Sequence, residues 1–258
     1  MEQYFQKTLT CLVLHACMLM CPDLWAEASR ELAEKFTIEQ MVEYKSLPSY
    51  SQAPSLKKLE EKGEIPPIGQ RLPAEPFVWK TNVMVDGPGV YGDVLRRVYG
   101  AGTEGWNFAV GQIQGWGGTE AYRESLINIS MMWVMKEPAP VPNLARSWEW
   151  ADDGYTLVMK LVEGVRWSDG YEFTAEDVIF SYDHILDDKI PSWQTKSTFS
   201  FGGQVTELKQ IDKYTVSWHF GIAYPVVAIY QMNERFPIVP AHILKQHHPK
   251  YNTSNSYN

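Results

Sequence analysis

Cysteine is almost absent from this sequence. Cys11, Cys17 and Cys21 all lie near the N-terminus, and no cysteine follows them. A chain without cysteine beyond that point has no disulfide framework, no thiolate zinc site and no catalytic thiol in its main body. Its stability therefore has to come from a packed core.

Features of several functional classes are missing as well. The formal net charge is −8 and the basic residues form no stripe, which argues against nucleic acid as a partner. The sequence contains no Walker-type phosphate loop and no G-x-S-x-G nucleophile elbow. Beyond the N-terminal region, no apolar run reaches membrane-spanning length. The sequence thus gives no indication of an ATPase, a hydrolase with a nucleophile elbow or an integral membrane protein.

The apolar run at 8–20 follows Lys7 and precedes Ala26-Glu27-Ala28. This order of a charged region, an apolar region and an A-x-A site is typical of a secretory signal peptide. The run is too short to cross a bilayer comfortably. Residues 1–28 are therefore predicted to be a signal peptide that exports the chain to the periplasm. A buried N-terminal helix and lipid attachment at Cys17 are the alternatives.

Periodicity and turn signals divide the rest of the chain. Helical spacing predicts a helix over 29–47 and a second, short helix over 57–62 that ends at Gly63, a favourable C-cap. The proline-rich segment 64–76 is predicted to be extended, because each proline fixes φ and removes a backbone donor. Further predictions are strands over 77–85, 91–99 and 207–220, and helices over 224–232 and from 240 onward.

The stretch 142–189 is the most informative part of the chain. Asp152-Asp153-Gly154 and Ser168-Asp169-Gly170 are tight-turn signals, because Asp starts turns and Gly accepts positive φ. Residues 155–161 alternate as a strand does. Thr174 opens a T-x-x-D capping box, after which apolar residues recur at helical spacing. The stretch therefore predicts strand, turn, strand, turn and capped helix.

The same stretch carries motifs that match a known signature. They are N-L-A-R-S-W-E at 143–149, D-D-G at 152–154, E-G-V-R-W-S-D-G at 163–170 and F-T-A-E-D-V at 173–178, followed by F-P-I-V-P-A-H at 236–242. Together they resemble the extracellular solute-binding proteins of family 5, which are the peptide, nickel and opine receptors of bacterial ABC importers. The likeness extends over roughly 63–251.

This resemblance implies a mixed α/β fold of the periplasmic-binding-protein type, in which two lobes close around a ligand. Because family members are longer, only the N-terminal part of lobe I and its inserted subdomain are expected here. The implied organisation is a signal peptide at 1–28, a helical and proline-rich extension at 29–76, the first part of lobe I at 77–108, the inserted subdomain at 109–210 and the return into lobe I at 211–258. The chain is then expected to stop before lobe II, as a truncated precursor or a gene fragment, and a genuinely short family member is the alternative.

Loop aromatics are the candidate ligand contacts. The predicted ligand-binding residues are Trp106, Asn107, Trp116, Trp193 and Phe199. Trp106 and Trp116 lie in Gly-rich loops, where a large ring gains less from packing than in a core, and Asn107 offers an amide. The resemblance places Trp193 and Phe199 near the point from which the inserted subdomain sends an aromatic toward the ligand. Trp148, Trp150 and Trp167, inside the strand signature, are interpreted as core.

Neither a catalytic site nor a metal site is predicted. Adjacent carboxylates such as Asp152-Asp153, Glu176-Asp177 and Asp187-Asp188 fit turns and caps, whereas a glycosidase needs two carboxylates that face each other across a bond. His242, His247 and His248 are not spaced to meet on one helix face, and no carboxylate cluster accompanies them. The expectation is therefore no metal and no cofactor.

The predicted function is a periplasmic solute-binding receptor rather than an enzyme. The resemblance implies that such a receptor captures a ligand between closing lobes and delivers it to an ABC transporter permease in the inner membrane. Oligopeptide is the first expected ligand, and the aromatic content makes oligosaccharide the second. A monomer is expected. The alternatives are a truncated remnant that no longer binds and a carbohydrate-active enzyme with the aromatics as sugar platforms.

Overall fold

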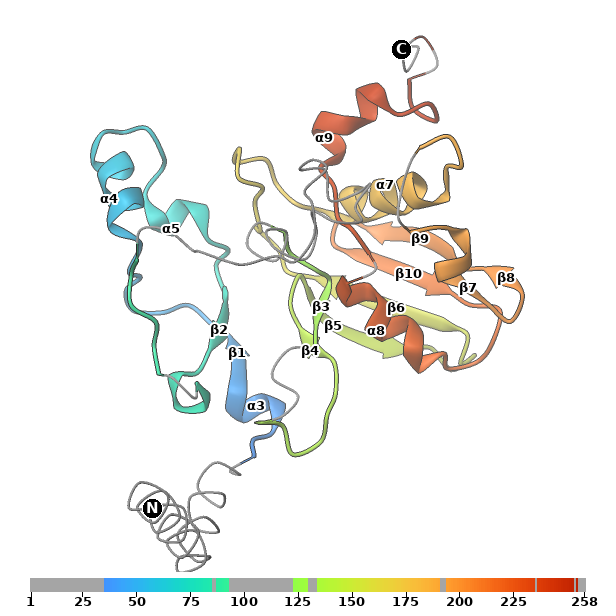
Figure 1. Cartoon of the computed structure of the whole chain (residues 1–258), viewed down its shortest axis with the longest axis horizontal. Coiled ribbons are helices and arrows are strands. Elements are labelled where there is room, and N and C mark those ends of the chain that lie inside the picture. The colour runs from blue at the N-terminus through green and yellow to red at the C-terminus, as the bar shows by residue number, and fades with distance from the viewer. Residues whose placement is uncertain are drawn as a thin grey trace, which may run out of the picture.

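The computed structural model describes most of the chain beyond residue 34. The described residues are 35–84, 87–92, 123–129, 134–190, 194–234, 236–252 and 254. Figure 1 shows a small N-terminal part, coloured blue to cyan, beside a larger part built from a central sheet and helices. This mixture of helices and antiparallel strands agrees with the predicted mixed α/β class.

A four-stranded antiparallel sheet forms the centre of the larger part, in the order β5-β6-β10-β9. Its strands are β5 (Ala145–Trp150), β6 (Thr156–Leu161), β9 (Glu207–Asp212) and β10 (Thr215–His219). The register brings Met159 of β6 opposite Trp148 of β5 and Val216 of β10. Because side chains alternate across a strand, these three residues share one face of the sheet, and Met159 and Val216 are fully buried there.

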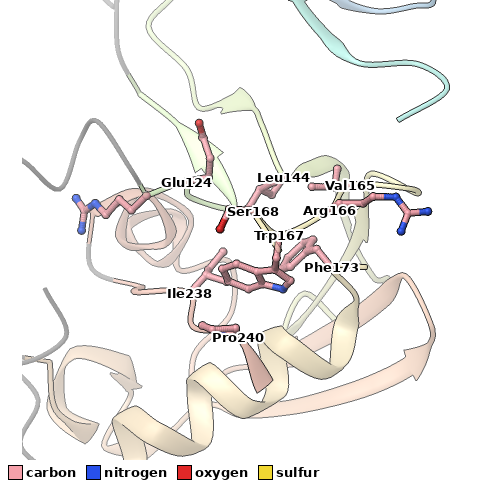
Figure 2. Close-up of a pocket in the computed structure, with 10 residues that line it drawn as sticks. Glu124, Leu144, Val165, Arg166, Trp167, Ser168, Phe173, Ile238 and Pro240 are labelled. Carbon is pink, nitrogen blue, oxygen red and sulfur yellow. The ribbon is translucent and has the colours of Figure 1, made fainter. Parts of the chain in front are cut away.

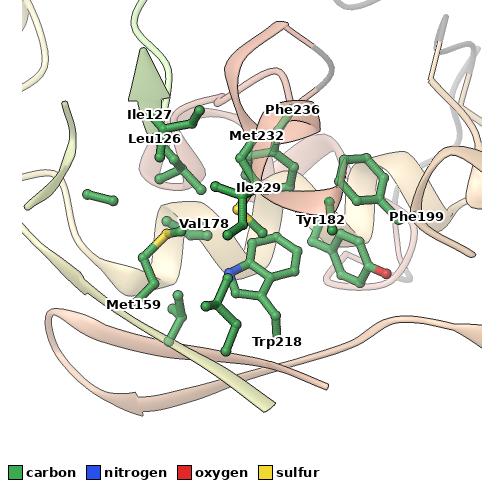
Figure 3. Close-up of a cluster of buried hydrophobic side chains, with 14 of the residues drawn as sticks. Leu126, Ile127, Met159, Val178, Tyr182, Phe199, Trp218, Ile229, Met232 and Phe236 are labelled. Atoms are coloured by element: carbon green, nitrogen blue, oxygen red, sulfur yellow. The ribbon is translucent and has the colours of Figure 1, made fainter. Parts of the chain in front are cut away.

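Helices α7 (Ala175–Leu186) and α8 (Val226–Glu234) pack on the buried face of the sheet. Figure 3 shows Trp218 of β10 rising from its strand into the side chains that the helices contribute. Tyr182 of α7 meets this indole edge-on at a centroid distance of 5.4 Å, and Ile229 of α8 belongs to the same cluster. One core therefore joins strands and helices from residues 126 to 238.

The turns and the cap predicted from sequence are confirmed. Gly154 and Gly170 have φ values of 69° and 89°, in the left-handed region that glycine adopts readily. At the start of α7, Thr174 donates its backbone N–H to the Asp177 carboxylate at 2.9 Å and accepts from the N–H of Glu176 at 3.3 Å. The Thr174 side chain also accepts from the backbone N–H of Asp177, which completes the capping box and fixes where α7 begins.

The N-terminal part differs from the prediction of a helix over 29–47. Among the described residues of that range, only α3 (Ile38–Met41) is helical, and β1 (Val42–Tyr44) follows at once. β1 pairs with β2 (Phe77–Trp79), and Val42 lies opposite Trp79. β-branched and aromatic side chains suit a strand, and the pairing partner outweighs the local helical spacing.

The short helices of this part follow the sequence more closely. Helix α4 (Pro54–Glu61) is the predicted second helix, and Gly63 ends it with φ 74°. The N–H of Gly63 bonds to Glu60 and that of Glu64 to Leu59, which is the Schellman arrangement. The prediction that 64–76 is extended is wrong in part, because this segment contains the helical turn α5 (Ile68–Arg71) after Pro67. The predicted strand over 77–85 is limited to β2 and a 3₁₀ turn, η1 (Thr81–Val83).

The remaining elements are short. They are β3 (Ile127–Asn128) paired with β4 (Val141–Pro142), β7 (Ser200–Phe201) paired with β8 (Gln204–Val205), the 3₁₀ turns η4 (Lys196–Phe199) and η5 (Lys245–His247), and α9 (Ala241–Leu244). The predicted strand pair over 207–220 and the helix near 224–232 are confirmed as β9, β10 and α8. The helix predicted from 240 is a single turn followed by η5. Most of the strand predicted over 91–99 lies outside the described residues.

Two predicted domain boundaries fall inside hydrogen-bonded structure. The boundary between 210 and 211 lies within β9, and β10 then pairs with both β9 and β6. The boundary between 76 and 77 separates β1 from its partner β2. A cut at either point would separate paired strands and expose unpaired backbone groups. Within the described part of the chain, no helix is long and apolar enough to cross a membrane.

Candidate ligand-binding site

A cavity of about 250 Å³ opens beside the indole of Trp167. We call it the Trp167 pocket. Its lining residues are Arg123, Glu124, Leu144, Val165, Arg166, Trp167, Ser168, Phe173, Ile238 and Pro240. Figure 2 shows Trp167 near the centre between Phe173 and Ile238, while Arg166 extends away to one side. The pocket thus has an apolar floor and a polar rim.

The E-G-V-R-W-S-D-G motif forms an arc over 163–173 that presents Trp167 to this pocket. Phe173 donates its N–H to Val165 and Trp167 donates its N–H to Tyr171, at 2.9 and 2.8 Å. The ring of Phe173 meets the Trp167 indole edge-on, with centroids 6.1 Å apart. Val165, Trp167 and Phe173 thus line this pocket, whereas Tyr171 lines a different cavity.

A pair of polar residues on α7 fixes the opposite wall of the pocket. The Asp177 carboxylate accepts the N–H of Ala241, and the Ser181 hydroxyl accepts the N–H of Val239, both at 2.9 Å. Ser181 in turn donates to the backbone carbonyl of Asp177 at 2.7 Å. The intervening Pro240 is held against α7 in this way, at the edge of the pocket. We call these contacts the Asp177–Ser181 latch.

Asp177 is only 3% exposed. Burial raises the pKa of its carboxyl, and the N–H donors of Thr174 and Ala241 oppose that shift by stabilising the carboxylate. Its neighbour Ser181 is fully buried. Buried polar groups of this kind are stabilising only when they are hydrogen-bonded, as both are here. The T-A-E-D signature therefore specifies a structural joint in addition to a helix cap.

The acidic pairs have the structural roles that the sequence suggested. Asp153 accepts bonds from the N–H groups of Tyr155 and Thr156 at 2.8 Å, and Asp187 accepts the N–H of Lys189 at 2.9 Å. Asp188 forms an ion pair with Lys196 at 2.6 Å. Asp153 and Asp187 are thus engaged in turns, and Asp188 in a surface ion pair.

The C-terminal histidines have separate surroundings. His242 bonds through Nε2 to Asp169 at 2.7 Å, whereas His248 is buried edge-on against Phe180. Burial lowers the pKa of His248, and also that of His184, whose ring lies 6.2 Å from it. In the part of the chain that is described, no three His, Cys, Asp or Glu residues are grouped so that they would hold a metal ion.

Most of the predicted ligand-binding residues cannot be placed against this pocket. Trp106, Asn107, Trp116 and Trp193 lie outside the described residues. Phe199 is described, and it is 1% exposed in the core. Its backbone carbonyl accepts bonds from the N–H and the hydroxyl of Thr206, at 2.8 and 2.7 Å.

These bonds fix Phe199 under the β7–β8 hairpin with its ring turned into the core. There it contacts the rings of Tyr182, Trp218 and Phe236 at centroid distances of 5.7 to 6.3 Å. The structure therefore gives Phe199 a packing role and leaves no exposed ring face for the predicted ligand contact. Trp148 and Trp150 pack against the core as predicted, whereas Trp167 both packs and lines the pocket.

The pocket itself was not predicted from sequence. Its walls come from separate segments, around Arg123, Leu144, Trp167 and Ile238, which are brought together by the sheet and the latch. The motif at 163–170 is the available signal, but from sequence its Trp167 is interpreted as core. The described lining combines apolar side chains with Arg123, Glu124, Arg166 and the Ser168 hydroxyl.

Comparison with known proteins identifies the family of this fold. The model of the middle region of bacterial extracellular solute-binding proteins, family 5, matches residues 139–258. The periplasmic alpha-galactoside-binding protein of Rhizobium meliloti is 42% identical over 227 residues, which cover 85% of this chain and 33% of that protein. The dipeptide-binding protein of Escherichia coli is 31% identical over 91 residues, 30% of this chain and 17% of that protein.

Solved structures give the same result. The periplasmic binding protein MelB of Agrobacterium fabrum, in complex with stachyose, aligns with a TM-score of 0.75 and 43% identity, over 88% of this chain and 35% of that one. The oligopeptide-binding protein OppA aligns with a TM-score of 0.60 and 32% identity, over 80% of this chain and 30% of that one. The chain thus spans about a third of the length of the galactoside-binding relative and of MelB.

Proposed function

Because the chain belongs to the bacterial extracellular solute-binding proteins of family 5, we propose that it forms one wall of a periplasmic receptor for α-galactoside oligosaccharides. In this role it binds its ligand without making or breaking a covalent bond. The receptor works as a monomer in the periplasm, after export by the segment 1–28, and passes its ligand to an ABC transporter permease in the inner membrane.

One observation carries the choice of ligand. The similarity to the stachyose-bound MelB extends over 88% of this chain at 43% identity, whereas the similarity to OppA is lower in both respects. The alpha-galactoside-binding relative covers nearly the same share of the chain. This reverses the order expected from sequence, in which oligopeptide came first. Oligopeptide is retained as the second candidate because of OppA.

The chemistry of the Trp167 pocket supports a saccharide ligand. An indole wall beside Phe173 and Ile238 offers an apolar surface to the C–H face of a sugar ring. Ser168 and the charged rim offer donors and acceptors for hydroxyl groups. With a volume of about 250 Å³, the cavity lies just below the usual range of ligand pockets, about 300–1,000 Å³, and suits a single ring.

A chimeric receptor tests the proposal, because this chain spans only part of its relatives. In the chimera, this chain replaces the matching third of MelB, and stachyose binding is measured by calorimetry. We expect an affinity within about tenfold of MelB, a loss of no more than about 1.4 kcal/mol. A chimera that unfolds cooperatively but binds no α-galactoside would overturn the proposal and favour a remnant that no longer binds.

Two further experiments with the chimera, a peptide titration and a product analysis, separate the remaining alternatives. Tetraalanine tests the peptide receptor, and it should leave the chimera unchanged. A stachyose sample incubated with the chimera and then analysed by chromatography tests the carbohydrate-active enzyme. The expected outcome is intact stachyose. Within the chimera, Trp167→Ala should weaken stachyose binding, and Trp148→Ala, which removes a tryptophan that does not line the pocket, should change the affinity less.

A further inference from the structure

A second cavity lies on the other side of the 163–173 arc. Its volume is about 480 Å³, and it is lined by Arg166, Gly170, Tyr171, Glu172, Thr174, Glu176, Gln210 and Lys213. We call it the Tyr171 surface. Arg166 is shared with the Trp167 pocket, and the other lining residues differ. Unlike that pocket, the Tyr171 surface is lined mainly by polar side chains.

One of the lining residues, Tyr171, is both exposed and held in place. Tyr171 is 57% exposed, so much of its ring is accessible to a ligand. One face of the ring stacks on the imidazole of His242, with centroids 4.0 Å apart and planes 9° from parallel. His242 is fixed in turn by its bond to Asp169 at 2.7 Å. The ring is therefore an oriented platform that has little rotamer freedom left to lose on binding.

Polar groups are fixed around this platform. Arg166 donates one guanidinium N–H to the carbonyl of Gly170 at 2.9 Å, so that the arc orients its remaining donors. The Glu172 carboxylate accepts from Lys213 at 2.7 Å and from the hydroxyl of Tyr214. These two donors lower the pKa of Glu172 and keep it an acceptor at neutral pH.

The charges around the cavity balance one another. Arg166 and Lys213 are cationic, and Glu172 and Glu176 are anionic. A site for a phosphate or a metal ion would present an excess of one sign, whereas fixed donors and acceptors of both signs suit a neutral ligand with many hydroxyl groups. An oriented aromatic face with such groups at its edge matches the amphipathic shape of a pyranose ring.

We propose that the Tyr171 surface is a second saccharide-binding contact, on which a sugar ring stacks against the free face of Tyr171 and bonds to Arg166 and Glu172. The inference rests on the proposed ligand class, since a different ligand for the receptor would remove the reason to expect a sugar here. It adds a contact outside the Trp167 pocket, on the opposite side of the same arc.

Fluorine NMR of the full chain labelled with 3-fluorotyrosine tests this inference. The Tyr171 resonance is assigned by its disappearance in Tyr171→Phe, and stachyose is titrated into the labelled chain. We expect a saturable shift of that resonance, and no saturable shift for Tyr91, which is equally exposed at 57%. His242→Ala, which removes the stacked partner, should weaken the Tyr171 response about threefold to tenfold, the usual worth of an aromatic contact.

The outcomes separate this inference from the proposed function. If the MelB chimera binds stachyose while the chemical shift of Tyr171 does not change, the proposal of a second contact fails and the receptor proposal stands. If Tyr171 responds to stachyose while the chimera does not bind, the receptor proposal fails and the surface contact remains. An equal response of Tyr171 to tetraalanine would also overturn the inference, because it would show an unselective aromatic contact.

Discussion

The Asp177 carboxylate accepts the backbone N–H of Ala241 at 2.9 Å, across 64 positions of sequence. The same side chain, through its second oxygen, accepts the N–H of Thr174 at the start of α7. One buried carboxylate therefore serves as a helix cap and as the anchor of a distant segment. That segment supplies Ile238 and Pro240 to the Trp167 pocket, so the pocket depends on this bond.

Asp177→Ala should destabilise the chain by about 2–4 kcal/mol, because it removes a cap and leaves the Ala241 N–H unpaired in the interior. Urea unfolding followed by circular dichroism measures the change. Asp152→Ala, at an exposed position of the neighbouring turn signal, is the matched control and should change stability by less than about 0.5 kcal/mol. Similar losses for both variants would contradict the anchoring role.

Gly154→Ala tests the turn between β5 and β6. Gly154 has φ 69°, and a Cβ there would lie 2.7 Å from the Tyr224 ring. We expect a loss of about 2–4 kcal/mol in unfolding free energy from backbone strain and steric overlap together. Gly203→Ala is the control, since its φ is 77° with nothing within 4 Å of the added atom, and it should lose only about 1–2 kcal/mol. Equal losses of unfolding free energy in the two variants would show that the overlap with Tyr224 does not destabilise the fold.

Phe199→Ala distinguishes a core ring from a ligand contact. Because Phe199 is 1% exposed among aromatic neighbours, its truncation should cost about 3–5 kcal/mol of stability. In the MelB chimera, the milder Phe199→Leu should keep the fold and leave stachyose affinity within about twofold of the parent. A stable Phe199→Leu chimera that fails to bind would restore the ligand-contact interpretation.

Acid should weaken the fold through His184 and His248. Burial lowers the pKa of both rings from the ordinary 6.5, so the folded chain favours their neutral forms. The two neutral rings contribute fully to the unfolding free energy above pH 6.5, and this contribution is lost as the pH falls toward the folded pKa values. Unfolding free energies measured between pH 7.5 and 5 should decrease with acid.

The double variant His184→Gln/His248→Gln should flatten that decrease. The pH dependence that comes from Asp177 has the opposite sign. Burial raises the pKa of its carboxyl above 3.8, so the stability linked to this group declines as the pH rises through the folded pKa. His247→Gln, outside the buried pair, is the control. An unchanged slope in the double variant would show that other groups cause the acid sensitivity.

Local chemistry alone determined much of this protein. The turns at Gly154 and Gly170, the cap at Thr174, the Schellman end at Gly63 and the alternation along β6 all follow from residues that are near one another in sequence. These signals need no partner elsewhere in the chain, because each depends on φ preference, on a short hydrogen bond or on side-chain period. Gly154, Gly170 and Thr174 also belong to the motifs that carried the family resemblance, which the comparisons confirmed.

The tertiary structure decided the rest. Val42 became part of a strand because Trp79 lies opposite it, and Phe199 became core because its carbonyl is bound by Thr206. The insertion of β10 between β6 and β9 joined segments that the predicted boundary at 210 had separated. The Trp167 pocket combines walls from around Arg123 and Ile238. Each of these outcomes depends on contacts between residues far apart in the chain, and no local preference encodes which distant partner a backbone or ring will meet.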